Sequence, residues 1–296
     1  MFIMMGAVAY FIVVERKGLG MMQLRHGPNK VGFKGLVQPL ADGVKLFKKE
    51  YCFPHPLTKV TYAVGPIMCF TSAYGLYLVF PVSFSSVHFE LGMLFFLCVS
   101  SFSVYGVIVT GWLCNSRYAF LGAMRAVAQT ISYEVFMSTA LFGILLLVGS
   151  YDLTLIRLNV FFTGSLGFVS LGLWVIAVLA ETNRAPFDFV EGESELVAGY
   201  MTEVSGGGFA LLALAEYSNM MFVSMLTGVI FFNLGMGATF FGDLVFAGWT
   251  VFFSYAFVWV RATMPRYRYD LLMNLCWTLL LPVSLSMFAL ILAIAG

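Results

Sequence analysis

The sequence predicts an all-α polytopic membrane protein with about eight transmembrane helices and an interfacial amphipathic helix, both termini lying on the outer side. Of its 296 residues, 60% are hydrophobic and 10% are charged, and the mean hydropathy is +0.91. Soluble domains carry about 25% charged residues, and a helix needs about 20 mostly apolar residues to cross a bilayer. Several windows meet that length and no linker separates a soluble part, so we expect a single membrane domain over 1–296.

Eight apolar segments can be drawn as spans, roughly at 1–24, 60–81, 90–113, 118–149, 161–181, 207–231, 243–262 and 271–294. In the first span only fourteen residues precede Glu15, which gives about 21 Å of helix against a hydrocarbon core of about 30 Å. We therefore expect its charged end to emerge near the interface or into a protein-lined cavity. The fourth span is longer than an upright helix needs, so we expect it to be tilted.

The orientation follows from the lysines and arginines in the connecting loops. The loops after the first, third, fifth and seventh spans hold fourteen of them, whereas the loops on the other side hold only Arg157. Such an imbalance marks the inside face of a membrane protein. We therefore place an inside loop at 25–59 and an acidic inside loop at 181–206. With a net charge of +1 and no basic run, the chain is not expected to bind nucleic acid.

A further helix is expected within the first inside loop, in "FKGLVQPLADGVKLFKKEY" at 33–51. On a helical wheel its apolar side chains share one arc and its lysines occupy the other side, which is typical of a helix lying in the interface. Pro39 is expected to bend this helix. Two roles stay open: docking on lipid alone, or forming the floor of a portal for a lipid-soluble ligand.

The sequence offers no obvious ligand set for haem, an iron–sulfur cluster or a structural metal. Its five cysteines occur singly, and none of its three histidines lies in the middle of an apolar segment. Ligands for these groups normally come at defined spacings. We therefore expect no metal site and no redox centre in this chain, so that the electrons for any redox chemistry come from a partner.

Three carboxylates fall within spans, where an ionisable group costs several kcal/mol and is a functional candidate by default. Glu134 lies in the middle of the fourth span, Glu181 ends the fifth, and Glu216 lies inside the sixth. Each acid can be a neutral or paired group that only fixes helix packing. The apolar middles of the spans hold no lysine to pair with them, so we favour a chain of carboxylates that exchange protons near neutral pH.

The second inside loop concentrates acids in a chain that has few. Its stretch "ETNRAPFDFVEGESE" at 181–195 holds a third of the 15 acidic residues, with Arg184 as its only base. A solvated acidic loop is the ordinary interpretation. The alternation of acids with Phe187, Phe189 and Val190 instead favours a loop that packs against another surface.

Several long strings resemble one protein family. They are "ERKGLGMMQLRHGPNKVG" at 15–32, "QPLADGVKLFKKE" at 38–50, "AFLGAMRAVAQTISYEV" at 119–135, "AETNRAPFDFVEGESELVAGY" at 180–200, "LALAEY" at 212–217 and "RATMPRYRYD" at 261–270. Together they make the chain similar, over nearly its whole length, to the subunit 1 family of NADH:ubiquinone oxidoreductase, respiratory complex I. The acidic-loop string and the string around 23–29 are the most specific.

The resemblance implies a heel subunit that joins the peripheral redox arm to the proton-pumping membrane arm. Such a subunit forms much of the ubiquinone portal and chamber and couples quinone reduction to proton translocation. The residues implied for the chamber and portal are Glu15, Arg16, Arg25, Asp42, Arg184, Asp188, Glu191, Glu193 and Glu195. Those implied for a proton relay are Glu134, Glu181 and Glu216, and those for the arm contact are Arg261, Arg266, Arg268 and Asp270.

The resemblance also implies a setting for the chain. As a subunit it has no activity alone and binds no cofactor by itself, because ubiquinone is the substrate and NADH, FMN and the iron–sulfur clusters belong to partner subunits. Its implied partners are other membrane-arm subunits, peripheral-arm subunits that include the carrier of the terminal iron–sulfur cluster, and an anionic lipid such as cardiolipin. Its implied location is the mitochondrial inner membrane, with both termini on the intermembrane side; the alternative is a bacterial plasma membrane.

Three other interpretations stay open at the level of sequence. A self-contained ion transporter would be expected to show an internal repeat with interrupted helices, and neither is visible. The membrane-anchor subunit of energy-converting hydrogenases shares the fold without using a quinone, so the presence of a flavin or of a nickel site in the complex would discriminate. An inert scaffold is disfavoured by the cost of burying acids.

Overall fold

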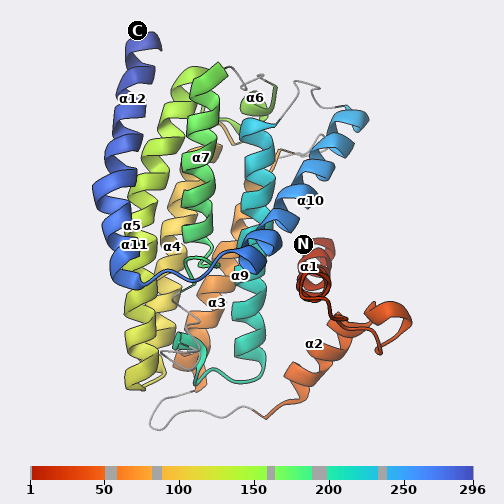
Figure 1. The fold of residues 1–296 in the computed structure, drawn as a ribbon. Coiled ribbons are helices and arrows are strands. Elements are labelled where there is room, and N and C mark those ends of the chain that lie inside the picture. Colours follow the sequence, from red (N-terminus) through yellow and green to blue (C-terminus); the bar gives the residue numbers. More distant parts are fainter. Residues whose placement is uncertain are drawn as a thin grey trace.

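The computed structural model describes residues 2–50, 59–81, 89–158, 164–188, 199–232 and 239–295. Within these ranges the regular secondary structure is entirely helical, and the long helices form a bundle (Figure 1). Six helices have the length and the apolar composition needed to cross a membrane. The predicted fold class, an all-α polytopic membrane protein, is therefore confirmed.

Each of the eight predicted spans coincides with a helix or a run of helical turns. The first four correspond to α1 (Phe2–Met22), α3 (Lys59–Gly75) continued by η2 (Leu76–Val79), α4 (Gly92–Leu113) and α5 (Arg117–Val148). The last four correspond to α7 (Gly164–Glu181), α9 (Gly207–Phe231), α10 (Phe240–Thr263) and α11 (Tyr269–Leu275) with η4 (Cys276–Leu280) and α12 (Leu281–Ala295). The short helix α6 (Leu153–Leu158) and the turn η3 (Gly199–Met201) lie between these elements.

The helices α1 and α7 are not among the six helices that have the length and composition needed to cross a membrane. The apolar part of α7 is shorter than a full span, at Gly167–Glu181, and α1 carries three charged residues in sequence, starting at Glu15. The C-terminus lies at the end of the bundle opposite α2 (Figure 1). The total of eight spans and the outer position of both termini stay predictions.

The amphipathic helix α2 (Gln38–Lys48) forms within the predicted stretch but is shorter. The expectation that Pro39 bends it is wrong, because the helix begins at Gln38 and the proline falls in its first turn. A proline is tolerated there, since the N–H that it lacks would have no partner inside the helix. The apolar side chains of this stretch are exposed, namely Val37, Leu40, Val44 and Phe47.

The core lies where α5 packs against α4, α7 and α12 (Figure 1). Local signals fix both ends of α5: the Ser116 hydroxyl accepts a hydrogen bond from the amide of Ala119, and Gly149 ends the helix in a left-handed conformation. Between these ends, Tyr133 and Phe136 are fully buried together with Trp174 of α7. Large aromatic side chains thus supply much of the buried area.

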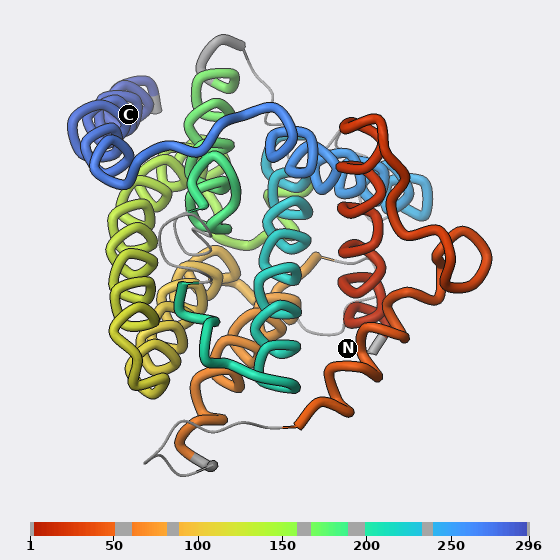
Figure 2. The backbone as a smooth tube through the Cα atoms, turned by 60° about the horizontal axis from the view of Figure 1, so that its bottom comes forward, coloured from red at the N-terminus to blue at the C-terminus, as the bar shows by residue number. Residues whose placement is uncertain are grey.

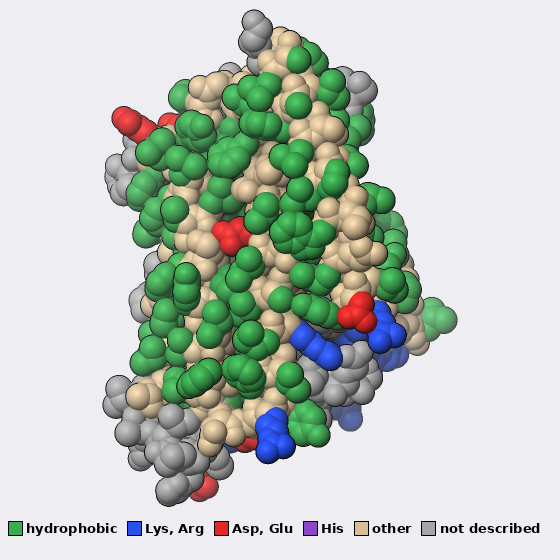
Figure 3. Space-filling view, turned by 90° about the vertical axis from the view of Figure 1, so that its left-hand side faces the viewer, with side chains coloured by type: hydrophobic (Ala, Val, Ile, Leu, Met, Phe, Trp, Pro, Cys, Tyr) green, Lys and Arg blue, Asp and Glu red, His purple; other side chains and the backbone are tan. Residues whose placement is uncertain are grey.

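The helices α1 and α2 pack on the other side of the bundle, beside α9 (Figure 2). The surface made by α12 and α5 carries hydrophobic side chains along its whole length, with an acidic side chain visible midway, and cationic side chains gather near its lower end (Figure 3). That distribution is typical of a surface that faces lipid or neighbouring membrane helices, with charges at the interface.

One buried arginine secures the end of the bundle that carries α6. Arg157 is 4% exposed, donates to the carbonyl oxygen of Pro81 at 2.8 Å, and pairs with Asp243 at the start of α10. Its guanidinium also lies 5.2 Å from the ring centroid of Phe246. The arginine that the sequence places alone in the outer loops therefore has a structural role in joining α6 and α10.

Candidate functional site

The described part of the acidic loop, 182–188, is packed against α5. Gln129 is fully buried, and its Nε2 donates to the carbonyl oxygens of Ala180 at 3.0 Å and Phe187 at 2.9 Å. The amide of Tyr267 donates to the carbonyl oxygen of Pro186 at 3.0 Å, which ties the loop to the segment before α11. The expectation of a loop packed against another surface holds for these residues.

A buried charge cluster, defined here as Glu15, Arg184, Arg261 and Tyr217, lies where α1, α9, α10 and the acidic loop meet. Glu15 of α1 is 4% exposed, and its Oε1 accepts from Nη1 of Arg184 at 3.0 Å and from Nη1 of Arg261. The guanidinium of Arg184 also lies 4.4 Å from the ring centroid of Tyr217. The sequence thus brings together side chains that are as many as 246 positions apart.

The cluster holds Arg184 as a cation. Burial by itself lowers the pKa of Arg184, but Tyr217 and Glu15 outweigh that effect, so its pKa lies above the ordinary value. A buried carboxylate between two arginines is a fixed charge pattern rather than an exchangeable proton, because neutralising Glu15 would leave two cations facing each other.

The same loop makes a second ion pair through Asp188. This carboxylate is 6% exposed and accepts from Nη2 of Arg266 at 3.3 Å. Arg268 pairs with Asp270 at 3.2 Å, and both side chains are exposed. Of the four residues expected at the arm contact, two therefore touch the candidate chamber residues directly: Arg261 through Glu15, and Arg266 through Asp188.

Of the other residues expected at the portal, Arg16 lies on α1, Asp42 lies on α2, and Arg25 follows the end of α1. Nη1 of Arg16 pairs with Asp42 at 2.9 Å, and Nε2 of Gln38 donates to the other oxygen of that carboxylate. This pair joins α2 to the charged end of α1. Arg25 is exposed and donates to Gln23 within its own turn, at 2.8 Å.

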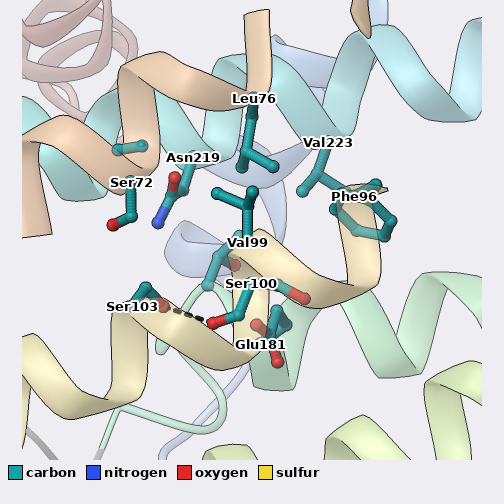
Figure 4. Close-up of a pocket in the computed structure, with 11 residues that line it drawn as sticks. Ser72, Leu76, Phe96, Val99, Ser100, Ser103, Glu181, Asn219 and Val223 are labelled. Carbon is teal, nitrogen blue, oxygen red and sulfur yellow. Dashed lines mark hydrogen bonds between the residues drawn. The ribbon is translucent and has the colours of Figure 1, made fainter. Parts of the chain in front are cut away.

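The buried acids gather around two adjoining cavities inside the bundle. The smaller cavity lies between α3, α4, α7 and α9, and Figure 4 shows Glu181 on one side of it and Asn219 and Ser72 on the other. The larger cavity, about 60 Å³, is also lined by Glu181 and Asn219 and extends to Glu216. A polar space of that size can hold water. Glu181 and Glu216 therefore share one polar interior.

The lining of these cavities is rich in acceptors. Among the described residues nothing donates to Oε2 of Glu181, nor to the side-chain oxygens of Asn183 and Asn219. On the far side, the hydroxyl of Tyr200 in η3 donates to Oε1 of Glu216 at 2.8 Å. Glu181 faces acceptors and has no ion pair among the described residues. It can hold a proton or release it, because neither state breaks an ion pair.

Glu134 is half-buried in the middle of α5 and lies close enough to Glu181 to act on it electrostatically. Thr130 and Ser138 lie four residues either side of Glu134 on this helix, and their hydroxyls donate to carbonyl oxygens of the same helix. The three intramembrane acids are therefore brought to one region. Glu191, Glu193 and Glu195 lie outside the described residues.

Sequence reasoning missed Tyr217 and Tyr200, which contact Arg184 and Glu216 respectively. Tyr217 directly follows Glu216, so the pair "EY" was a usable signal, whereas nothing local marks Tyr200. Among the residues that the structure describes, no group of three or more His, Cys, Asp or Glu side chains could hold a metal ion.

Comparison with known proteins gives consistent matches. Residues 1–292 match the model of a family described as NADH dehydrogenase. The protein named NADH-ubiquinone oxidoreductase chain 1 of Heterololigo bleekeri is 49% identical over 290 residues, which cover 95% of this chain and 90% of that protein. Its namesakes from Aedes aegypti and Osphranter rufus are 48% and 43% identical, each covering 95% of this chain and 89% and 90% of their own lengths. The resemblance seen in the sequence motifs is confirmed, and the chain belongs to the NADH dehydrogenase family.

Proposed function

We propose that this chain is the heel subunit of an NADH:ubiquinone oxidoreductase, where it forms part of the ubiquinone portal and chamber and couples quinone reduction to proton translocation. One observation carries the proposal. Ion-paired residues of the acidic loop, α1 and α10 adjoin an interior cavity lined by Glu181 and Glu216. A change of charge near the loop would thus act on carboxyl groups a short distance inside the bundle.

In this proposal the ion-paired acids and the acids of the interior cavities have different roles. The portal and chamber include Glu15, Arg16, Arg25, Asp42, Arg184 and the loop acids Asp188, Glu191, Glu193 and Glu195. Reduction of the quinone creates negative charge that must be protonated, and the fixed cluster orients that charge relative to the interior. Glu181, Glu216 and Glu134 then respond by taking up or releasing protons toward the pumping subunits.

The same proposal gives the chain its surroundings. Its partners are the membrane-arm subunits and the peripheral-arm subunits that carry FMN and the iron–sulfur clusters, with the arm contact at Arg266, Arg268, Asp270 and Arg261. It lies in the mitochondrial inner membrane, and the exposed apolar and lysine-bearing sides of α2 rest at the interface on anionic lipid such as cardiolipin.

The test uses Glu216→Gln and Glu134→Gln variants in the intact complex. We expect each variant to lower NADH:ubiquinone turnover about tenfold, the equivalent of about 1.4 kcal/mol in the barrier, and to reduce proton pumping. NADH oxidation by an artificial acceptor at the flavin should be unchanged, because that site lies in another subunit. Glu90→Gln, which alters an exposed acid, is the matched control.

Full retention of turnover and pumping by both variants would contradict the relay. The membrane-anchor alternative is tested separately by the composition of the purified complex. The proposal expects flavin that is reduced by NADH, whereas a nickel centre in its place would assign the chain to a hydrogenase-type complex.

A further inference from the structure

The hydroxyl group of Tyr200 meets the carboxylate of Glu216 inside the bundle. Its oxygen lies 2.8 Å from Oε1 of Glu216, and the tyrosine is 3% exposed. A hydrogen bond from a hydroxyl to an ionised carboxylate is short and stronger than one between neutral groups. The contact therefore stabilises the ionised form of Glu216 relative to the protonated form.

The backbone around Tyr200 is held by contacts with Cys114 and with α5. Its carbonyl oxygen accepts from the thiol of Cys114, which follows α4. On α5, a Cβ atom added to Gly122 would lie 2.9 Å from the backbone of Gly199 and 3.0 Å from the amide nitrogen of Tyr200. The turn η3 thus packs directly on the backbone of α5. The position of Tyr200 is therefore set by the packing of η3 on α5.

Other groups also face this part of the interior. The titratable or charged ones around Glu216 are Cys69 of α3, Glu181 at the end of α7, Arg184 of the acidic loop and Tyr200 of η3. The polar neutral ones on the cavity wall are Ser103 of α4, Thr130 of α5, Asn183, and Asn219 of α9 itself. Arg184 pairs with Glu15 and also acts electrostatically on Glu216. The hydroxyl of Tyr200 is a hydrogen-bond donor to Oε1 of Glu216.

We propose that Tyr200 is a positioning residue for proton exchange at Glu216: its hydroxyl, held by the packing of η3 on α5, sets the pH at which that carboxyl group takes up a proton. The inference rests on the proposed function, because it matters only if Glu216 exchanges protons during turnover. A purely structural tyrosine would need a hydrogen-bond partner as well, but its loss would not move the proton affinity of Glu216.

The test measures the pH profile of NADH:ubiquinone turnover in the intact complex carrying Tyr200→Phe, which removes only the hydroxyl. The limb of the profile that depends on Glu216 is identified as the one that Glu216→Gln abolishes. In Tyr200→Phe this limb should move to higher pH by about one unit, because the ionised carboxylate loses its donor. Adding Tyr200→Phe to Glu216→Gln should change the residual profile no further.

Tyr77→Phe is the matched control. The hydroxyl of Tyr77 donates at 2.8 Å to the backbone carbonyl of Ser218, which lies on α9 as Glu216 does, and this partner is not an acid. It should leave the position of the limb unchanged. An unmoved limb in Tyr200→Phe, or an equal shift in Tyr77→Phe, overturns the inference while Glu216→Gln still shows its defect. Full activity of Glu216→Gln would instead remove the proposed relay on which the inference rests.

Discussion

The charge cluster and the interior cavities both contain buried carboxylates, but the groups around those carboxylates differ between the two regions. Glu15 lies between two arginines, whereas Glu181 borders a space lined by amide, hydroxyl and thiol groups. Glu216 borders the same space, and Arg184 also acts on it electrostatically. A carboxylate between cations is held in its ionised form, because protonating it would leave the cations without a compensating negative charge. A carboxyl group among neutral polar groups can change its protonation at much lower cost. The first arrangement suits a fixed electrostatic framework and the second suits proton exchange.

The largest expected effect is on the charge cluster. Replacing Glu15 with Gln leaves Arg184 and Arg261 facing each other without their anion, which should cost about 3–5 kcal/mol. We expect little assembled complex and a lower midpoint of thermal inactivation. Arg117→Gln, at an exposed arginine that starts α5, is the control. Equal midpoints for the two variants would show that the cluster is not a framework.

The stabilising effect of the cluster should also be independent of pH. The pKa of Arg184 is raised above its ordinary value by Glu15 and Tyr217 despite burial. A group with a raised pKa contributes its full stability below its unfolded pKa and loses it only as the pH rises through the folded one. The difference in thermal midpoint between Glu15→Gln and the parent complex should therefore stay constant from about pH 6 to about pH 9. A difference that varies within this window would contradict a locked ion pair.

Glu181→Gln tests the other half of the comparison, the acids that line the interior cavities. Because no ion pair of Glu181 is present among the described residues, this change should leave the midpoint of thermal inactivation unchanged or higher. Turnover with ubiquinone should fall about tenfold if the carboxyl group exchanges protons. A large loss of stability with normal turnover per assembled complex would assign Glu181 to the framework instead.

A moderate effect is expected at the close contact between α5 and η3. Gly122→Ala inserts a methyl group where backbone atoms already lie about 3 Å away, and overpacking of this kind costs about 1–3 kcal/mol. The displaced turn should also shift the pH profile of turnover, as Tyr200→Phe does. Gly172→Ala, where the added atom meets nothing within 4 Å, is the control and should change neither quantity.

The smallest effect is expected at the pair between Arg16 and Asp42, where the arginine side chain is 52% exposed. Exposed ion pairs contribute about 0–1 kcal/mol and are screened by salt. Arg16→Gln should lower the thermal midpoint slightly at low ionic strength and not at high ionic strength. An effect as large as that of Glu15→Gln would mean that the attachment of α2 supports the whole cluster.

The sequence was sufficient to locate the long helices, but not to show which of the candidate residues contact one another. Apolar length alone located the helices, because a bilayer requires it. Pro39 was misjudged, since the start of α2 could not be placed to within a turn. The contact of Gln129 with Ala180 and Phe187, and that of Glu15 with Arg261, depend on how distant helices pack. No local sequence pattern predicts that packing. The distinction between ion-paired acids and acids that can exchange protons therefore requires the three-dimensional structure, even when the residues themselves are correctly chosen.

The central claim, that interior acids exchange protons while the cluster stays fixed, is tested most directly by redox-difference infrared spectroscopy of the intact complex. Reduction by NADH should produce a change in the carboxyl C=O region that is lost or shifted in Glu181→Gln and Glu216→Gln. The same change should persist in Asp188→Asn, which alters an ion-paired acid. A signal that survives in both interior variants, or that disappears only in Asp188→Asn, would contradict the account.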